Sequence, residues 1–411
     1  MPSPPSVYTV VPFAAMLLAV ALGPLAVPHW WEASRNKLAV AAVLGLPVFG
    51  LYLVRRPSAL IGAAGDYVSF IVLLAGLYAI SGGILLRGDL EATPLTNTVF
   101  LALGATLASL IGTTGASMLL IRPLLQTNRE RRRVKHTVVF FIFLVSNIGG
   151  LLTPIGDPPL FLGYLHGVPF TWTFRLWRPW ATMVGALLVI YFIWDSTQHA
   201  RESMAARRRD REQIEPLRLR GAGNLVLLAG VVLAVALLRA PVREIVIVVL
   251  AGLSLWRTPR AVRRANTFTA APMIEVAVLF FGIFLTMIPA LDLLRLRGDE
   301  LGVREPWQFF WASGLLSSFL DNAPTYLTFL ALGQGLRLTN EIIGVPDAVL
   351  AAISVGSVAM GANTYIGNAP NFMVKAIAEA SGIRMPGFFT YMAYSGGVLI
   401  PLFIALTWVF F

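Results

Sequence analysis

Small polar residues interrupt four otherwise apolar stretches of this chain. TPIGDPP (153–159) ends a run that begins at Val138, and TYIGNAP (364–370) ends a similar run. GTTG (112–115) and DNAP (321–324) interrupt two more. Hydroxyl, amide and carboxylate oxygens suit small hard cations, and a carboxylate inside an apolar segment is costly enough to indicate a functional site. The four breaks therefore predict sites for a small ion or a small molecule.

The candidate ligands are short, oxygen-bearing side chains within or beside the four breaks. They are Thr113, Thr114, Asn147, Thr153, Asp157, Asp321, Asn322, Asn363, Thr364 and Asn368. Asp157 and Asp321 are the candidate Na⁺ ligands, one in each of two predicted sites. Burial favours the protonated form of a carboxyl group and a bound cation favours the ionised form. A buried carboxylate can therefore exchange a proton for Na⁺ or Li⁺. Both aspartates also precede prolines, as helix caps do, so capping remains an alternative.

The composition is that of a membrane protein. The chain of 411 residues is 57% hydrophobic and 13% charged, against ~25% charged in soluble domains. Several runs reach the ~20 residues that cross a bilayer, which predicts an all-α polytopic protein. About ten spans are expected, at 7–27, 38–54, 67–86, 137–165, 177–195, 222–238, 242–256, 273–292, 347–380 and 389–411. The segments 96–125 and 306–332 are expected to be re-entrant hairpins, because each half has only about 15 residues.

The net charge of +11 does not indicate nucleic-acid binding. Sixteen of the 32 Lys and Arg residues lie in 126–136, 197–221 and 257–266, where they are typical of cytoplasmic anchors. With two hairpins these loops share one side, which predicts a bacterial inner-membrane protein with its N-terminus outside. We interpret Val7–Val27 as a span rather than a cleaved signal. Without cysteine or known catalytic motifs, the chain is expected to be a transporter that needs no cofactor beyond Na⁺ or H⁺ as coupling ions.

An internal repeat relates the two halves of the chain. TPIGDPP aligns with TYIGNAP at an offset of 211, and the two RGD triplets and the two hairpin tips align at 210 and 209. This predicts a first repeat at 1–196, a basic cytoplasmic loop at 197–221 and a second repeat at 222–411. Five spans per repeat would invert the second relative to the first, as in secondary transporters.

TPIGDPP, TYIGNAPN and SSFLDNAPT resemble the broken-helix loops and a hairpin tip of the ion transporter superfamily, over roughly 60–411. That superfamily includes citrate and divalent anion transporters, arsenite efflux pumps and NhaD-type sodium/proton antiporters. The resemblance implies a scaffold and a transport domain, homodimers and elevator-type alternating access. Asp157 replaces a threonine of the carboxylate carriers, which favours sodium (lithium)/proton antiport. A cation-coupled citrate or dicarboxylate symporter and an arsenite-type efflux carrier remain alternatives.

Overall fold

The computed structural model describes residues 5–212, 214–337 and 341–411, and 77% of the chain is helical. The helices of the first half are α1 (Val11–Ala26), α2 (Pro28–Trp31), α3 (Ser34–Arg55), α4 (Pro57–Ser81), α5 (Pro94–Ile111), α6 (Thr113–Thr127), α7 (Lys135–Leu144), α8 (Pro158–Leu165), α9 (Trp177–Ala200) and α10 (Met204–Glu212). Those of the second half are α11 (Gly223–Leu237), α12 (Val242–Arg257), α13 (Arg260–Ala265), α14 (Ala271–Thr286), α15 (Ile288–Arg297), α16 (Pro306–Ser317), α17 (Asn322–Gly335), α18 (Asp347–Ala359), α19 (Ala369–Ala380) and α20 (Phe388–Phe410). The strands β1 (Leu85–Arg87) and β2 (Arg218–Arg220) pair antiparallel. Short 3₁₀ helices lie at Val7–Val10, Ile148–Leu152, Phe170–Leu176, Gly298–Leu301 and Met360–Asn363.

The protein is a multi-pass membrane protein, but with fewer long spans than expected. Within the described ranges, seven helices are long and apolar enough to cross a membrane, or eight if the bent pair α14–α15 is one span. The prediction of about ten is not met by this measure. With 15 and 16 residues, α11 and α12 are shorter than the ~20 that a full crossing takes. The predicted span 347–380 is divided into α18 and α19 by its break.

Both segments predicted to be re-entrant hairpins fold as two helices separated by a short break, and one differs in length from the prediction. That each segment enters and leaves on the same side stays a prediction. At the second tip, α16 and α17 flank a short break that ends at Asp321. At the first tip, α5 has 18 residues and qualifies by itself as a candidate span. The expected length of about 15 was wrong, because Thr93 caps α5 and accepts a hydrogen bond from the Thr96 amide, so the helix starts earlier and runs to Gly112.

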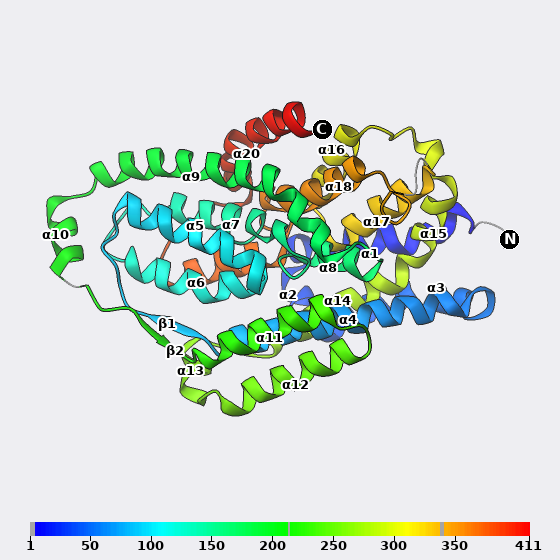
Figure 1. Cartoon of the computed structure of the whole chain (residues 1–411), viewed down its shortest axis with the longest axis horizontal. Coiled ribbons are helices and arrows are strands. Elements are labelled where there is room, and N and C mark those ends of the chain that lie inside the picture. The colour runs from blue at the N-terminus through cyan, green and yellow to red at the C-terminus, as the bar shows by residue number, and fades with distance from the viewer. Residues whose placement is uncertain (1–4, 213, 338–340) are drawn as a thin grey trace.

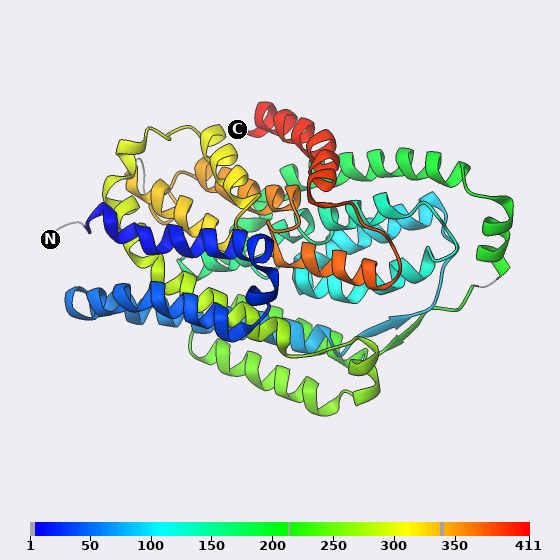
Figure 2. The same ribbon diagram turned by 180° about the vertical axis from the view of Figure 1, so that it is seen from behind.

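Most of the long helices run roughly along one axis (Figure 1). The helices α3, α11, α12 and α14 pack around α4, and Phe70 of α4 lies 4.7 Å from Phe280 of α14 between ring centroids. Seen from behind, the blue helices α1 and α3 lie on one side and the orange helix α19 packs beside the cyan helix α6 (Figure 2). Contacts of this kind position the four breaks, since close side-chain packing is what associates helices in lipid.

The basic segments are more structured than predicted. Residues 197–221 were expected to be a solvated linker, but they contain the end of α9, helix α10 and strand β2. In the basic loop 126–136, Arg131 and His136 are buried rather than exposed anchors. Both contact Asp195 of α9, at 2.5 and 2.8 Å. Arg131 and His136 pack against the buried Asp195 carboxylate, because an uncompensated charge there would be costly.

Asp89 belongs to the first of the two RGD triplets, in the loop between β1 and α5. Asp89 is only 2% exposed, and its Oδ1 has no hydrogen-bond partner among the described atoms. Burial first, and the Glu130 carboxylate second, raise the pKa of Asp89 from 3.8 to about 6. The triplet therefore belongs to the packed end of the molecule, near α10.

We expect this pKa shift to make stability depend on pH. Between pH 3.8 and about 6 the folded state holds the Asp89 proton and the unfolded state has lost it. Stability should therefore fall as pH rises through this window and then level off. The melting temperature of Asp89→Asn should show a flatter pH dependence than wild type. An unchanged slope in the variant would contradict the assignment to Asp89.

Candidate functional site

The Asp157 carboxylate accepts a hydrogen bond from a residue of each of the other three breaks. Its Oδ1 accepts hydrogen bonds from Thr113 Oγ1 at 2.7 Å and from Asn368 Nδ2 at 3.3 Å, and its Oδ2 accepts one from Asn322 Nδ2. Thr113 begins α6, Asn322 begins α17 and Asn368 precedes α19. One carboxylate therefore joins both hairpin tips and both broken spans.

Asp157 does not act as a conventional helix cap. It occupies the N-cap position of α8, but its side chain makes no capping hydrogen bond. The residue is 1% exposed, and no Lys, Arg or His nitrogen of the described residues lies within 4.0 Å of its carboxylate. Its contacts are neutral hydroxyl and amide donors. A buried carboxylate without a basic partner is electrostatically incomplete unless it takes up a proton or a cation.

Asp321 has a different environment from Asp157. Its Oδ1 accepts a hydrogen bond of 3.0 Å from the Ala323 amide, so it caps α17. It is partly exposed and lines a cavity. The two predicted sites therefore differ in their contacts, because Asp157 contacts both halves and Asp321 caps its own helix.

Two substitutions at Asp321 should separate capping from any ionic role. Asp321→Ala removes the acceptor for the Ala323 amide and should destabilise the protein by about 1 kcal/mol. Asp321→Asn retains a capping oxygen and should leave the melting temperature near wild type. Thermal unfolding in detergent measures both. Equal losses in the two variants would show that the negative charge, rather than the cap, is what stabilises this tip.

Asparagines link the two broken spans behind Asp157. Asn147 Nδ2 donates to Asn371 Oδ1 at 2.7 Å and to the Ile142 carbonyl at 2.8 Å. Asn368 Nδ2 also lies 3.1 Å from the Ser146 carbonyl. These bonds satisfy carbonyls that the helix breaks leave without partners, as buried irregular backbone requires. They also fix the amide donors that face Asp157.

The same side-chain contacts recur in both halves. Thr153 Oγ1 donates to the Ser109 carbonyl, and Thr364 Oγ1 donates to the Ser318 carbonyl. Ser109 Oγ donates to the carbonyl of Gly149, and Ser318 Oγ to that of Met360, at 3.1 Å. Each hairpin tip is thus bonded to the broken span of its own half. The serines were not among the predicted site residues, although their equal placement before the two tips was a usable signal.

Two further predicted residues, Thr114 and Asn363, belong to the breaks but make no hydrogen bond to Asp157 among the described contacts. Thr114 is half-buried and lines the cavity. Asn363 Nδ2 donates to Ser318 Oγ at 2.9 Å, while its buried Oδ1 has no partner among the described atoms. Within the described ranges, no group of three or more His, Cys, Asp or Glu side chains could hold a metal ion. Any Na⁺ site here would use hydroxyl, amide and carbonyl oxygens as well as a carboxylate.

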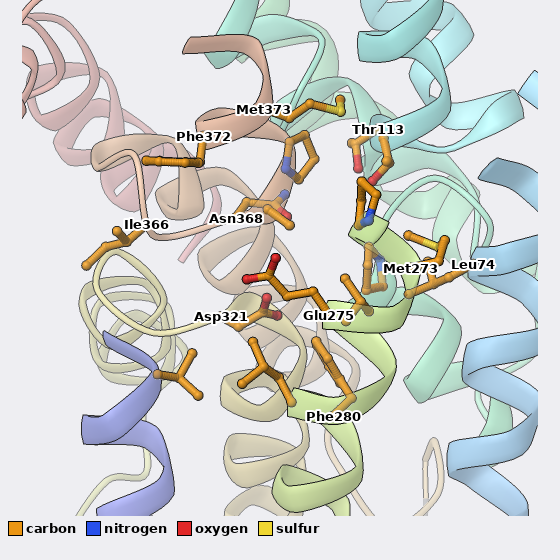
Figure 3. A pocket seen from close by; sticks show the side chains of 18 of the residues that line it. Leu74, Thr113, Met273, Glu275, Phe280, Asp321, Ile366, Asn368, Phe372 and Met373 are labelled. Atoms are coloured by element: carbon orange, nitrogen blue, oxygen red, sulfur yellow. The ribbon is translucent and has the colours of Figure 1, made fainter. Parts of the chain in front are cut away.

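A cavity of about 840 Å³ opens beside these residues. Figure 3 shows Thr113, Glu275, Asp321 and Asn368 directed into it. The starts of α6, α8, α17 and α19 contribute to its wall, through residues that include Thr113, Pro158, Asp321 and Ala369. Helix N-termini carry a positive partial charge. Few of their amides are free here, because Pro158, Pro159, Pro324 and Pro370 have no N–H and the Ala323 amide donates to Asp321. The partial charges alone would favour an anionic group inside the cavity.

The charged residues of the cavity wall were largely missed in the sequence. They are Glu32, Lys37, Glu275, Asp321 and Lys375. Lys37 pairs with Glu275, and Lys375 pairs with Glu379 at 2.9 Å as the i,i+4 spacing predicted. Lys37 directly precedes the predicted span 38–54, so it had the pattern of an interfacial flank. Asp66 directly precedes the predicted span 67–86, but it lies within α4, because that helix starts at Pro57.

Comparison with known proteins identifies the family. A family model whose description reads "Putative citrate transport" (CitMHS_2) matches residues 3–411. No protein of curated function matches the chain. The match covers nearly the whole sequence and agrees with the resemblance of its broken-helix motifs to the ion transporter superfamily. Such a family implies a small-molecule substrate and membrane embedding. The chain therefore belongs to the CitMHS_2 family of citrate-transporter-like membrane proteins.

Proposed function

We propose that this protein is a secondary active transporter that carries a citrate-like carboxylate through the cavity, coupled to H⁺ or Na⁺ at Asp157. The observation that carries the proposal is the position of Asp157. It is buried, contacts Thr113, Asn322 and Asn368, and has no basic partner among the described residues. Binding or losing one positive charge there changes the hydrogen bonds of both hairpin tips at once. This gives a direct link between ion occupancy and the substrate cavity.

The shape and charge of the cavity support a carboxylate substrate. Its volume of about 840 Å³ lies within the ~300–1,000 Å³ usual for small-molecule sites. The starts of four helices line it, and their positive partial charge favours carboxylate oxygens. Three acids and two lysines line it, which would repel a free trianion. Citrate would therefore enter together with protons or cations that neutralise part of this charge, which is symport.

Sodium (lithium)/proton antiport is the second candidate. It is favoured by the same lone carboxylate, because a proton and a small cation can compete for Asp157 without any organic substrate. The partly exposed Asp321 adds negative charge to the route into the site. An arsenite-type efflux carrier has no separate observation in its favour.

Several features implied by the resemblance belong to this proposal. The recurring Ser109–Thr153 and Ser318–Thr364 contacts support an inverted repeat. Such repeats permit alternating access, here by elevator movement of the hairpins and broken spans. A homodimer and an inner-membrane orientation with the N-terminus outside complete the arrangement that we propose.

Purified protein in liposomes would test the two candidates together. An inward Na⁺ or proton gradient should drive accumulation of radiolabelled citrate. In a second arm, Na⁺ or Li⁺ is added to vesicles with an imposed pH gradient and no citrate. Citrate accumulation supports symport, and dissipation of the gradient by the cation alone supports antiport. Absence of both responses would overturn the proposed function.

A further inference from the structure

A partly buried ion pair forms part of the cavity wall. Lys37 Nζ of α3 contacts Glu275 Oε1 of α14. The Lys37 side chain is 3% exposed, whereas that of Glu275 is 48% exposed. Both residues line the cavity, and Figure 3 shows Glu275 directed into it. The lysine is thus buried in the wall, and the glutamate is the partner that is exposed to the cavity.

The position of this pair is unusual for a purely structural contact. The α2 turn that precedes Lys37 lies near the middle of the molecule in both views, rather than at an end (Figures 1 and 2). Glu275 belongs to one of the apolar helices proposed to lie in the membrane. Charges inside membrane segments are costly and usually serve function. Apolar residues of similar volume would often pack as stably as a buried ion pair.

We infer that Lys37 is a specificity-determining residue that binds a carboxylate of the substrate, with Glu275 as its counter-ion in the empty cavity. This inference rests on the proposed function. Lys37 and Lys375 are the basic residues among those that line the cavity. Lys375 is already engaged by Glu379 and by the rings of Tyr365 and Phe372.

Exchange of Glu275 for a substrate carboxylate at Lys37 would let a trianion bind in a cavity whose wall contains acids. An ammonium group has three donors, and Glu275 is the only hydrogen-bond partner of Lys37 Nζ among the described residues. A substrate carboxylate can therefore join or replace Glu275 without leaving the lysine unpaired. The positive partial charges of the helix starts that line the cavity then favour the remaining carboxylates. The site would prefer substrates with two or more carboxylates over those with one.

Substitutions at the two residues should change citrate affinity in opposite directions. Lys37→Met should raise the KM for citrate by about tenfold or more, because a charge-assisted contact is lost. Glu275→Gln leaves Lys37 charged and removes its competitor, so its KM should be at or below the wild-type value. Lys37→Arg retains the charge, so its KM for citrate should remain close to the wild-type value. This variant keeps the inference testable if Lys37→Met fails to fold. The matched control is Arg56→Met. Arg56 belongs to another ion pair near the end of α3, with Asp292 at 2.8 Å, and does not line the cavity.

Citrate uptake into liposomes and citrate-induced thermal stabilisation of the purified protein provide two readouts. If wild type binds and transports citrate but Lys37→Met has an unchanged KM, this inference fails while the proposed function stands. Parallel losses in Lys37→Met and Glu275→Gln would also overturn it, since they would indicate a structural ion pair. If wild type neither binds nor transports citrate, the proposed function itself fails.

Discussion

Replacing Asp157 by asparagine should reduce coupled transport by about 100-fold or more while leaving a folded protein. A charge-assisted hydrogen bond contributes about 1.5–3 kcal/mol, and Thr113, Asn322 and Asn368 all donate to this carboxylate. Asparagine has nearly the same shape, but it neither ionises nor accepts at both positions. The expected loss therefore concerns coupling and tip closure more than packing. Accumulation of citrate or Na⁺ against its gradient is the quantity to measure.

A structural role for Asp157 would give a different pattern. Citrate counterflow, the exchange of labelled for unlabelled citrate across the membrane, tests substrate binding and alternating access without ion coupling. We expect Asp157→Asn to retain part of this exchange while ion-driven accumulation disappears. Asp157→Glu keeps an ionisable group one methylene longer and should fall between wild type and Asp157→Asn. If Asp157→Asn accumulates substrate normally, Asp157 is not the coupling residue.

Sequence patterns predicted the main elements because breaks inside apolar runs have few physical solutions. Irregular backbone in a membrane must be satisfied inside the protein, so TPIGDPP and TYIGNAP had to face other polar groups. The contacts of Asp157 with Thr113 and Asn368 agree with that reasoning. Its bonds to Asn322 and Asn368 both cross between the two halves, and the alignment of the repeats gave no signal for such contacts.

Other features depend on packing that a single sequence does not reveal. Lys37 had the pattern of a helix flank and is instead buried against Glu275 of a helix far away in the chain. Asp89, in an apparently solvated triplet, is covered by the end of the molecule near α10. Long-range neighbours decided both of these cases.

The glycine of each broken loop should be as intolerant of substitution as Asp157. A Cβ built on Gly156 would lie 2.1 Å from the Gly150 carbonyl oxygen, and one built on Gly367 would lie 2.5 Å from that of Gly361. These neighbours are backbone atoms and cannot rotate away. Overpacking of this kind costs about 1–3 kcal/mol and occasionally more. Gly156→Ala and Gly367→Ala should therefore displace the loops and abolish transport.

Gly396 provides a matched control for these alanines. It lies in the interior of α20, with nothing within 4 Å of the position that an alanine methyl group would take, and alanine there should slightly stabilise the helix. Size-exclusion profiles and melting temperatures of the three variants separate misfolding from a folded but inactive protein. The two loop glycines should behave alike, because each allows two backbone segments of the same broken span to approach closely. Normal transport by Gly156→Ala would mean that the loop can relax, and that the close crossing is not what places Asp157 among its donors.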